Sequence, residues 1–162
     1  MQTTGIKTLI LTGVAAELGG SGIDYDFELQ DNLPLLRIDV TQIGQVISQL
    51  SINAREAMPN GGSLRISAAT ISLTEKESLT IEPGEYLHMV FKDSGIGIPV
   101  ENLPRIFDPY FTTKEMGCQK GMGLGLALRH SIIRHHHGQI LAESKTGEGT
   151  TMHIYLPVPH AT

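Results

Sequence analysis

The sequence is poor in aromatic residues, cysteine, positive charge and long apolar runs, and each shortage excludes a class of protein. It has no tryptophan, four phenylalanines and four tyrosines, and its single cysteine, Cys118, cannot form an internal disulfide, which suits a reducing compartment. The longest apolar run near the start, residues 9–16, is interrupted and too short to cross a bilayer. We therefore expect a cytoplasmic chain without direct membrane contact, whether or not a longer parent protein is membrane-anchored.

The charge balance speaks against a nucleic-acid binder. Twelve Lys and Arg stand against seventeen Asp and Glu, which gives a net charge of −5 and an isoelectric point near 5.8. Nucleic-acid binding needs a basic face, and the few aromatic side chains leave few platforms on which bases could stack. With 162 residues, the chain is long enough for one domain with its own hydrophobic core.

The pattern of apolar residues predicts an α/β chain. Helical spacing predicts helices over residues 6–18, 40–58 and 124–137, with a short one at 101–106. Alternation or β-branched composition predicts strands over residues 24–29, 34–38, 64–73, 86–92, 139–143 and 152–156. A polar stretch between the two central strands is expected to form an exposed loop.

A single carboxylate follows the strand predicted over residues 86–92. The sequence Lys92-Asp-Ser-Gly-Ile-Gly-Ile-Pro99 places Asp93 ahead of Gly95 and Gly97, which permit positive φ and close backbone approach. A carboxylate only accepts hydrogen bonds, and the exocyclic amine of adenine is a suitable donor, whereas guanine presents a carbonyl oxygen at that position. Taken alone, such a pattern is more often just a tight loop.

The longest predicted helix carries a polar strip along the edge of its apolar face. At about 100° per residue, Gln45, Gln49, Asn53 and Glu56 fall on this strip, and Asn53 lies nearest the apolar centre. An amide in that place must find partners or cost stability, so it either caps a group in the core or meets a ligand. Arg55 points to the opposite side of the helix and is expected to be solvated.

Two further segments carry candidate ligand-binding features. The segment Phe107-Asp-Pro-Tyr-Phe-Thr-Thr-Lys114 groups three aromatic rings, which could equally pack in the core or form the hinge of a lid. The segment Gly121-Met-Gly-Leu-Gly125 leads directly into the last helix. Free N–H groups at the start of a helix are a favourable environment for phosphate.

These four segments and a late Gly-Thr-Thr occur in a fixed order, and the chain resembles the catalytic and ATP-binding domain of two-component sensor histidine kinases. The resemblance covers residues 24–157, with residues 1–23 as an N-terminal helix and lead-in and residues 158–162 as the start of a linker. It implies the Bergerat ATP-binding fold, a two-layer α/β sandwich in which a mixed, mostly antiparallel sheet of about five strands is backed by about three helices.

The resemblance also implies ATP and Mg²⁺ as cofactors and a role for each matching residue. Asp93 corresponds to the aspartate that binds the adenine amine, and Asn53 to the asparagine that ligates Mg²⁺. Asn53 and Lys114 are the implied catalytic residues, with Lys114 at the foot of the ATP lid. The implied nucleotide-binding residues are Asn53, Asp93, Gly95, Gly97, Ile98, Phe107, Gly121, Gly123, Leu124, Gly125 and Thr150.

Two positions depart from the family pattern. Gln49 stands where related kinases commonly have asparagine, and where the gyrase and mismatch-repair ATPases have a glutamate that activates water. Without that carboxylate, efficient hydrolysis is not expected. Glu56 stands where many kinases carry lysine, so we expect Lys114 or Lys120 to offset the charge of the triphosphate instead.

No histidine of this chain is followed by the Glu and Asn/Thr-Pro pattern of a phosphoacceptor site. The resemblance therefore implies two partners, a separate histidine-containing dimerisation domain and a response-regulator receiver domain downstream. An anti-sigma-type serine kinase and a non-catalytic ATP-binding regulatory module remain alternatives. His135, His136 and His137 point about 100° apart, so they are not expected to share a metal ion, and cations at a helix C-terminus are the simpler interpretation.

Overall fold

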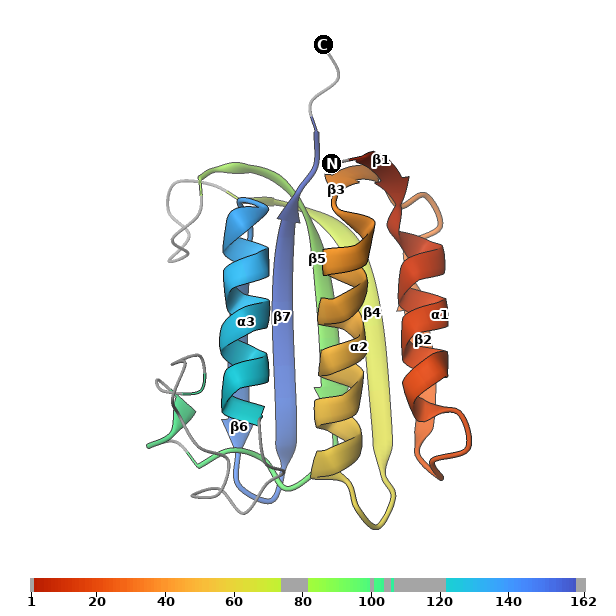
Figure 1. Cartoon of the computed structure of the whole chain (residues 1–162), viewed down its shortest axis with the longest axis vertical. Coiled ribbons are helices and arrows are strands. Elements are labelled where there is room, and N and C mark those ends of the chain that lie inside the picture. The colour runs from red at the N-terminus through yellow and green to blue at the C-terminus, as the bar shows by residue number, and fades with distance from the viewer. Residues whose placement is uncertain (1, 74–81, 100, 104–105, 107–121, 160–162) are drawn as a thin grey trace.

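The computed structural model describes residues 2–73, 82–99, 101–103, 106 and 122–159, with the backbone alone for residues 2 and 122–127. Within these residues the main sheet has the strand order β2 (Asp24–Leu29), β4 (Ser63–Leu73), β5 (Gly84–Asp93), β7 (Gly149–Pro157) and β6 (Gln139–Lys145). β2 and β4 pair in parallel, and the other pairs are antiparallel. Helices α1 (Ile6–Leu18), α2 (Val40–Ala57) and α3 (Met122–His135) cover one face (Figure 1). The predicted two-layer sandwich is confirmed.

Two short segments differ from the prediction. Strand β1 (Gln2–Gly5) was not expected, because its four residues have no apolar alternation. It pairs antiparallel with β3 (Leu35–Ile38) in a separate two-stranded sheet, to which β3 contributes two core side chains, Leu36 and Ile38. The short helix expected over residues 101–106 is not α-helical at 101–103 and 106, the positions that the structure describes there.

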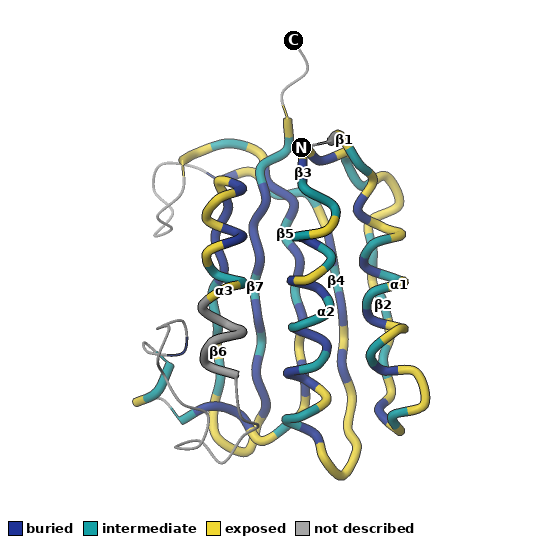
Figure 2. Tube along the Cα trace, in the orientation of Figure 1, coloured by how far each residue is buried: buried dark blue, intermediate teal, exposed yellow. Residues whose placement is uncertain are grey.

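Helix α2 starts at a side-chain cap and buries one face. The Asp39 carboxylate accepts a hydrogen bond from the Gln42 backbone N–H at 3.1 Å, which satisfies one of the free donors of the first turn. The buried residues of α2 are Ile43, Val46, Ile47, Leu50, Ser51, Asn53 and Ala54. Figure 2 shows buried positions concentrated here and in β5 and β7 at the centre of the sheet. None of the described helices is both long and apolar enough to cross a membrane.

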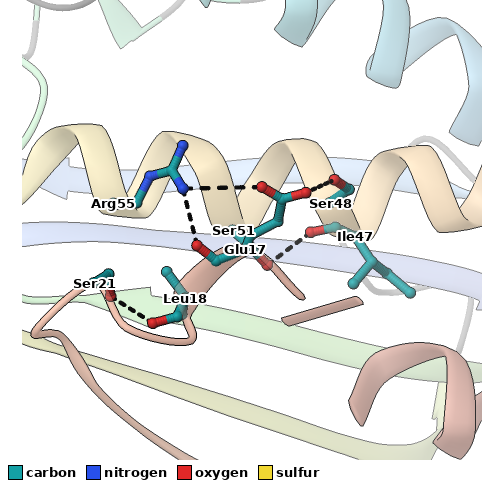
Figure 3. Close-up of polar contacts among 7 residues, drawn as sticks. All are labelled: Glu17, Leu18, Ser21, Ile47, Ser48, Ser51 and Arg55. Atoms are coloured by element: carbon teal, nitrogen blue, oxygen red, sulfur yellow. Dashed lines mark hydrogen bonds and ion pairs between the residues drawn. The ribbon is translucent and has the colours of Figure 1, made fainter. Parts of the chain in front are cut away.

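Glu17 fastens helix α1 to α2 (Figure 3). Its carboxylate accepts a hydrogen bond from the Ser48 hydroxyl at 2.8 Å, and its carbonyl oxygen accepts one from the Arg55 guanidinium at 2.9 Å. The same guanidinium lies 4.0 Å from the Glu17 carboxylate. Arg55 therefore forms contacts with α1 in addition to its contact with solvent. Its positive charge lies on the side of α2 that faces α1.

His136 joins the end of α3 to the start of α2. Its ring is buried, with Nδ1 donating to the Ile132 carbonyl oxygen at 2.8 Å and Nε2 accepting from the Asp39 backbone N–H at 3.1 Å. These two partners require a neutral ring, so the interpretation of His136 as a helix-capping cation is wrong. The helix ends earlier than residue 137 because His137 takes a left-handed φ of 65°. Among the described residues, no three His, Cys, Asp or Glu side chains are grouped to hold a metal.

The face of the sheet opposite the helices carries a histidine pair. His88 on β5 and His153 on β7 share a hydrogen bond of 2.9 Å between Nε2 and Nδ1, and the His88 ring stacks on Tyr155 at 4.5 Å between centroids. Their neighbours along the strands, such as Met89 and Ile154, point into the core instead. Burial, and to a smaller extent the neighbouring His153, lowers the pKa of His88 below its usual value of 6.5.

The lowered pKa of His88 makes stability depend on pH. The unfolded chain takes up a proton at His88 near pH 6.5, whereas the folded chain resists this protonation. The neutral His88 ring therefore makes its full contribution to the free energy of unfolding above pH 6.5, and this contribution is lost as the pH falls below that value. We expect the free energy of unfolding in urea to drop between pH 7.5 and 5.5. His88→Phe should reduce the drop, whereas His135→Gln, at an exposed position, should not. An equal drop in His88→Phe would contradict this assignment.

Candidate functional site

A cavity lies where the end of α2 meets the beginning of β7 and the turn after β5. Its walls are mostly apolar, and its lining residues are Leu50, Asn53, Ala54, Ala57, Leu64, Phe91, Asp93, Ile96, Gly97, Ile98, Thr150 and Met152. The structure thus brings five of the predicted site residues together, namely Asn53, Asp93, Gly97, Ile98 and Thr150. An apolar pocket with a few convergent polar groups is the usual form of a small-molecule site.

Asp93 is a buried carboxylate with one oxygen fixed by the backbone. Its side chain ends β5 and the residue is only 9% exposed. Oδ1 accepts hydrogen bonds from the N–H groups of Gly95 at 2.9 Å and Thr150 at 3.1 Å, and no described residue donates to Oδ2. Burial raises the pKa of Asp93 above its usual 3.8, although both backbone hydrogen bonds oppose the shift. The carboxylate is thus held in one orientation with an acceptor oxygen to spare.

The two glycines after Asp93 make room for the chain's own backbone. A Cβ on Gly97, where φ is +75°, would lie 2.1 Å from the Lys145 carbonyl oxygen, and one on Gly95 would lie 2.5 Å from the Ala57 carbonyl oxygen. Ile96 also donates its N–H to Ala57 at 3.1 Å. The turn is therefore wedged between the end of α2 and the β6–β7 turn. Of the two glycines, only Gly97 lines the cavity within the described residues.

Ser144 is a residue that sequence reasoning missed. Its hydroxyl accepts a hydrogen bond from the Ile98 N–H at 2.7 Å and donates to the Gly149 carbonyl oxygen at 2.8 Å, and it lies 2.9 Å from the Thr150 hydroxyl. It therefore fixes the turn after β5 to the first residues of β7. The available signal was the alternation of β6, in which Ser144 shares its face with Ile140 and Ala142 and so points inward.

Asn53 and Gln49 form an amide pair on α2. Gln49 Nε2 donates to Asn53 Oδ1 at 2.9 Å, one helical turn apart. Asn53 Nδ2 is buried and has no hydrogen-bond partner among the residues that the structure describes. The sequence left open whether this amide caps a core group or meets a ligand. A buried amide with an unused end on the wall of a cavity fits a ligand contact, since leaving it unpaired costs free energy.

The structure does not place the side chains of most of the remaining predicted residues. Phe107, Lys114 and Gly121 fall outside the described residues, as does Lys120. Gly123, Leu124 and Gly125 lie in the first turn of α3, where the structure describes the backbone alone. For these residues the assigned roles stay predictions.

Residues 38–160 match the protein family described as histidine kinase-, DNA gyrase B- and HSP90-like ATPases. The chain belongs to this family. Membership implies that the domain binds ATP, in keeping with the carboxylate and amide that line its cavity. It also accounts for the mixed sheet with helices on one face, which the solved structures described below share.

Relatives and solved structures agree with this assignment. The chain is 36% identical to the sensor kinase CckA of Brucella abortus (strain 2308); the match covers 96% of this chain and 17% of CckA. It is 34% identical to the sensor histidine kinase ZraS of Escherichia coli (strain K12), and that match covers 98% of this chain and 31% of ZraS. The catalytic domain of histidine kinase ThkA, nucleotide-free, superposes with a TM-score of 0.75 at 27% identity and 97% coverage of both chains. The mycobacterial sensor histidine kinase MprB, at 20% identity and TM-score 0.75, shares the fold over 96% of both chains.

The wedged turn predicts a strong effect of a single methyl group. Gly97→Ala must place a side chain at positive φ and displace the Lys145 carbonyl oxygen, so we expect a loss of at least about 2 kcal/mol in the free energy of unfolding. Gly44→Ala, in the middle of α2 with open space around its Cβ, should instead gain about 0.5–1 kcal/mol. Urea denaturation measures both. Equal effects of the two substitutions would mean that the turn is not packed as described.

Proposed function

We propose that this chain is the catalytic domain of a sensor histidine kinase, which binds Mg²⁺-ATP in the cavity and transfers the γ-phosphoryl group to a histidine of a separate dimerisation domain. The observation that carries the proposal is the Asp93 carboxylate, with one oxygen held by two backbone N–H groups and the other without a described donor. The chain spans less than a third of the curated relatives named above, so the activity of the whole protein is part of the proposal.

Adenine recognition follows from the chemistry of the cavity. Apolar side chains such as Leu50, Phe91 and Met152 line it, and such surfaces suit the faces of a purine ring. Oδ2 of Asp93 accepts a hydrogen bond from the exocyclic amine, while Oδ1 stays with its two backbone donors. Guanine would bring a carbonyl oxygen against the carboxylate, and two acceptors facing each other in a buried site are unfavourable.

Asn53 fits the role of the magnesium ligand. Its amide is buried on the cavity wall with one end unpaired, and an amide oxygen is a ligand that Mg²⁺ accepts. Rotation of both amides of the Asn53–Gln49 pair would keep their hydrogen bond and turn the Asn53 oxygen outward. Mg²⁺ held there would neutralise part of the charge of the phosphates. Lys114 or Lys120 supplies further positive charge in this proposal.

Transfer rather than hydrolysis is the expected reaction. Gln49, one turn before Asn53, has no carboxylate and cannot take a proton from water. The domain's own contribution is to orient the triphosphate and to stabilise its charge. The attacking nitrogen belongs to the imidazole ring of a histidine in the partner domain. In this proposal residues 24–157 form the catalytic unit, the domain works in the cytoplasm, and a response-regulator receiver domain accepts the phosphoryl group downstream.

Exchanging the carboxylate for an amide tests the adenine contact. Asp93→Asn keeps an oxygen for the two backbone donors but turns an NH₂ group toward the adenine amine, so two donors face each other. We expect the dissociation constant for ATP to rise at least tenfold, about 1.4 kcal/mol, while inosine triphosphate, which has a carbonyl acceptor in that place, loses less. Isothermal titration calorimetry measures both. The exposed Asp24→Asn is the matched control, and an unchanged preference for ATP over inosine triphosphate in Asp93→Asn would contradict the contact.

Phosphoryl transfer itself distinguishes the candidate functions. Incubation of this chain with the dimerisation domain of its parent protein and γ-labelled ATP should yield a phosphate bond on that domain that is labile in acid and stable in base, as expected of phosphohistidine. An acid-stable phosphate would indicate the serine-kinase alternative. Binding of ATP without any transfer would favour a regulatory module instead.

A further inference from the structure

Arg129, which is partly buried, shares one face of α3 with buried residues, where an apolar residue would be expected. Ile132, Ile133 and His136 follow it at spacings of three, four and seven residues, and all three are buried. The same spacing turns Arg129 toward the core, between α3 and the elements beneath it. The exposed residues of this helix, among them Leu128 and Arg134, lie on the other side.

Two nitrogens of the Arg129 guanidinium have no hydrogen-bond partner among the described residues. Its Nε and Nη1 atoms are buried, and no acceptor or carboxylate of the described residues binds either of them. Burial lowers the pKa of this group, yet an arginine keeps its charge at neutral pH. Buried guanidinium nitrogens without an acceptor destabilise a fold, so the arrangement makes physical sense if an anion completes it.

The packing of α3 against α2 directs Arg129 toward the cavity. The two helices lie side by side and run in opposite directions, and the His136–Asp39 hydrogen bond sets their register (Figure 1). Measured from that bond at 1.5 Å per residue, Arg129 lies about 10 Å along the pair and Asn53 about 21 Å. Helix side chains lean toward their own N-terminus, which for α3 is the end level with Asn53. We therefore infer that the arginine extends along the α2–α3 interface in the direction of the amide.

We propose that Arg129 binds the polyphosphate of the nucleotide and is a phosphate-positioning residue of this site. The inference rests on the proposed ATP site and deepens it. The cation of α2, Arg55, is bound to Glu17 on α1, and Glu56 brings negative charge to the same helix. A planar guanidinium can form two parallel hydrogen bonds to one phosphate, which gives it a geometric advantage over an ammonium group.

The test compares nucleotides that differ only in their phosphates. Arg129→Leu restores the apolar stripe and removes the charge, so we expect it to melt at a higher temperature than the unmodified chain and to bind ATP and ADP at least about tenfold more weakly. Its affinity for adenosine should stay within about twofold, because the Arg129 guanidinium contacts the phosphates and not the base. Calorimetry and differential scanning fluorimetry on the whole chain give the three affinities and the melting temperature.

Two further variants keep the test decisive. Arg129→Gln retains hydrogen-bonding capacity without charge, and its affinity for ATP should fall by a similar factor. This variant provides the measurement if the leucine variant does not fold. Arg134→Leu, the matched control on the exposed side of α3, should leave all three affinities unchanged.

Three results would overturn the inference. Unchanged ATP affinity in both Arg129 variants would mean that the guanidinium does not meet the phosphates. An equal loss for adenosine, or a lower melting temperature in Arg129→Leu, would mean that Arg129 has a structural partner within the chain. Failure of the unmodified chain to bind ATP would instead overturn the proposed function, and the inference with it, so the two failures are distinguishable.

Discussion

The site depends on one carboxylate oxygen that is held by two backbone N–H groups. Asp93 ends the central strand β5, and its Oδ1 joins the following turn, through Gly95, to the start of the neighbouring strand, through Thr150. Burial alone would favour the protonated form of this side chain, and the two donors work against that tendency. The same bonds that favour the ionised form of the carboxylate also close the turn against the sheet. Fold and ligand chemistry therefore share one set of contacts at this position.

The long elements could be predicted because their residues repeat a clear pattern. The boundaries of α1 and β2 agree with the residue pattern, and the buried face of α2 contains Val46, Ile47 and Leu50 as expected. The pairing of the strands could not be predicted, because β2 lies parallel to β4 across an intervening helix and β7 separates β5 from β6. Strand β1 depends on its partner β3 rather than on its own residues, which carry no alternation.

The candidate site was predictable only in part. Motif order pointed to Asp93, Asn53 and Thr150, which the fold brings to one cavity. The order of the motifs gave no indication of Ser144. The role of this residue arises from hydrogen bonds to the backbones of Ile98 and Gly149, which are far apart from each other in the chain. The glycines were expected to permit close backbone approach, and the chain that approaches them is the backbone of Lys145 and Ala57. Local sequence indicates that a close approach occurs but not what approaches.

The donors to Asp93 belong to the main chain, and this has a consequence for how the site can drift during evolution. Every amino acid except proline offers the same N–H, so residue 150 can change its side chain without losing this bond, provided the backbone path survives. Residue 95 must stay glycine, because a Cβ there would meet the Ala57 carbonyl oxygen. No other residue type can replace the acceptor in the same way. Divergent relatives would therefore keep the aspartate while the surrounding residues change. The preference for adenine would persist after most of the neighbouring sequence had changed.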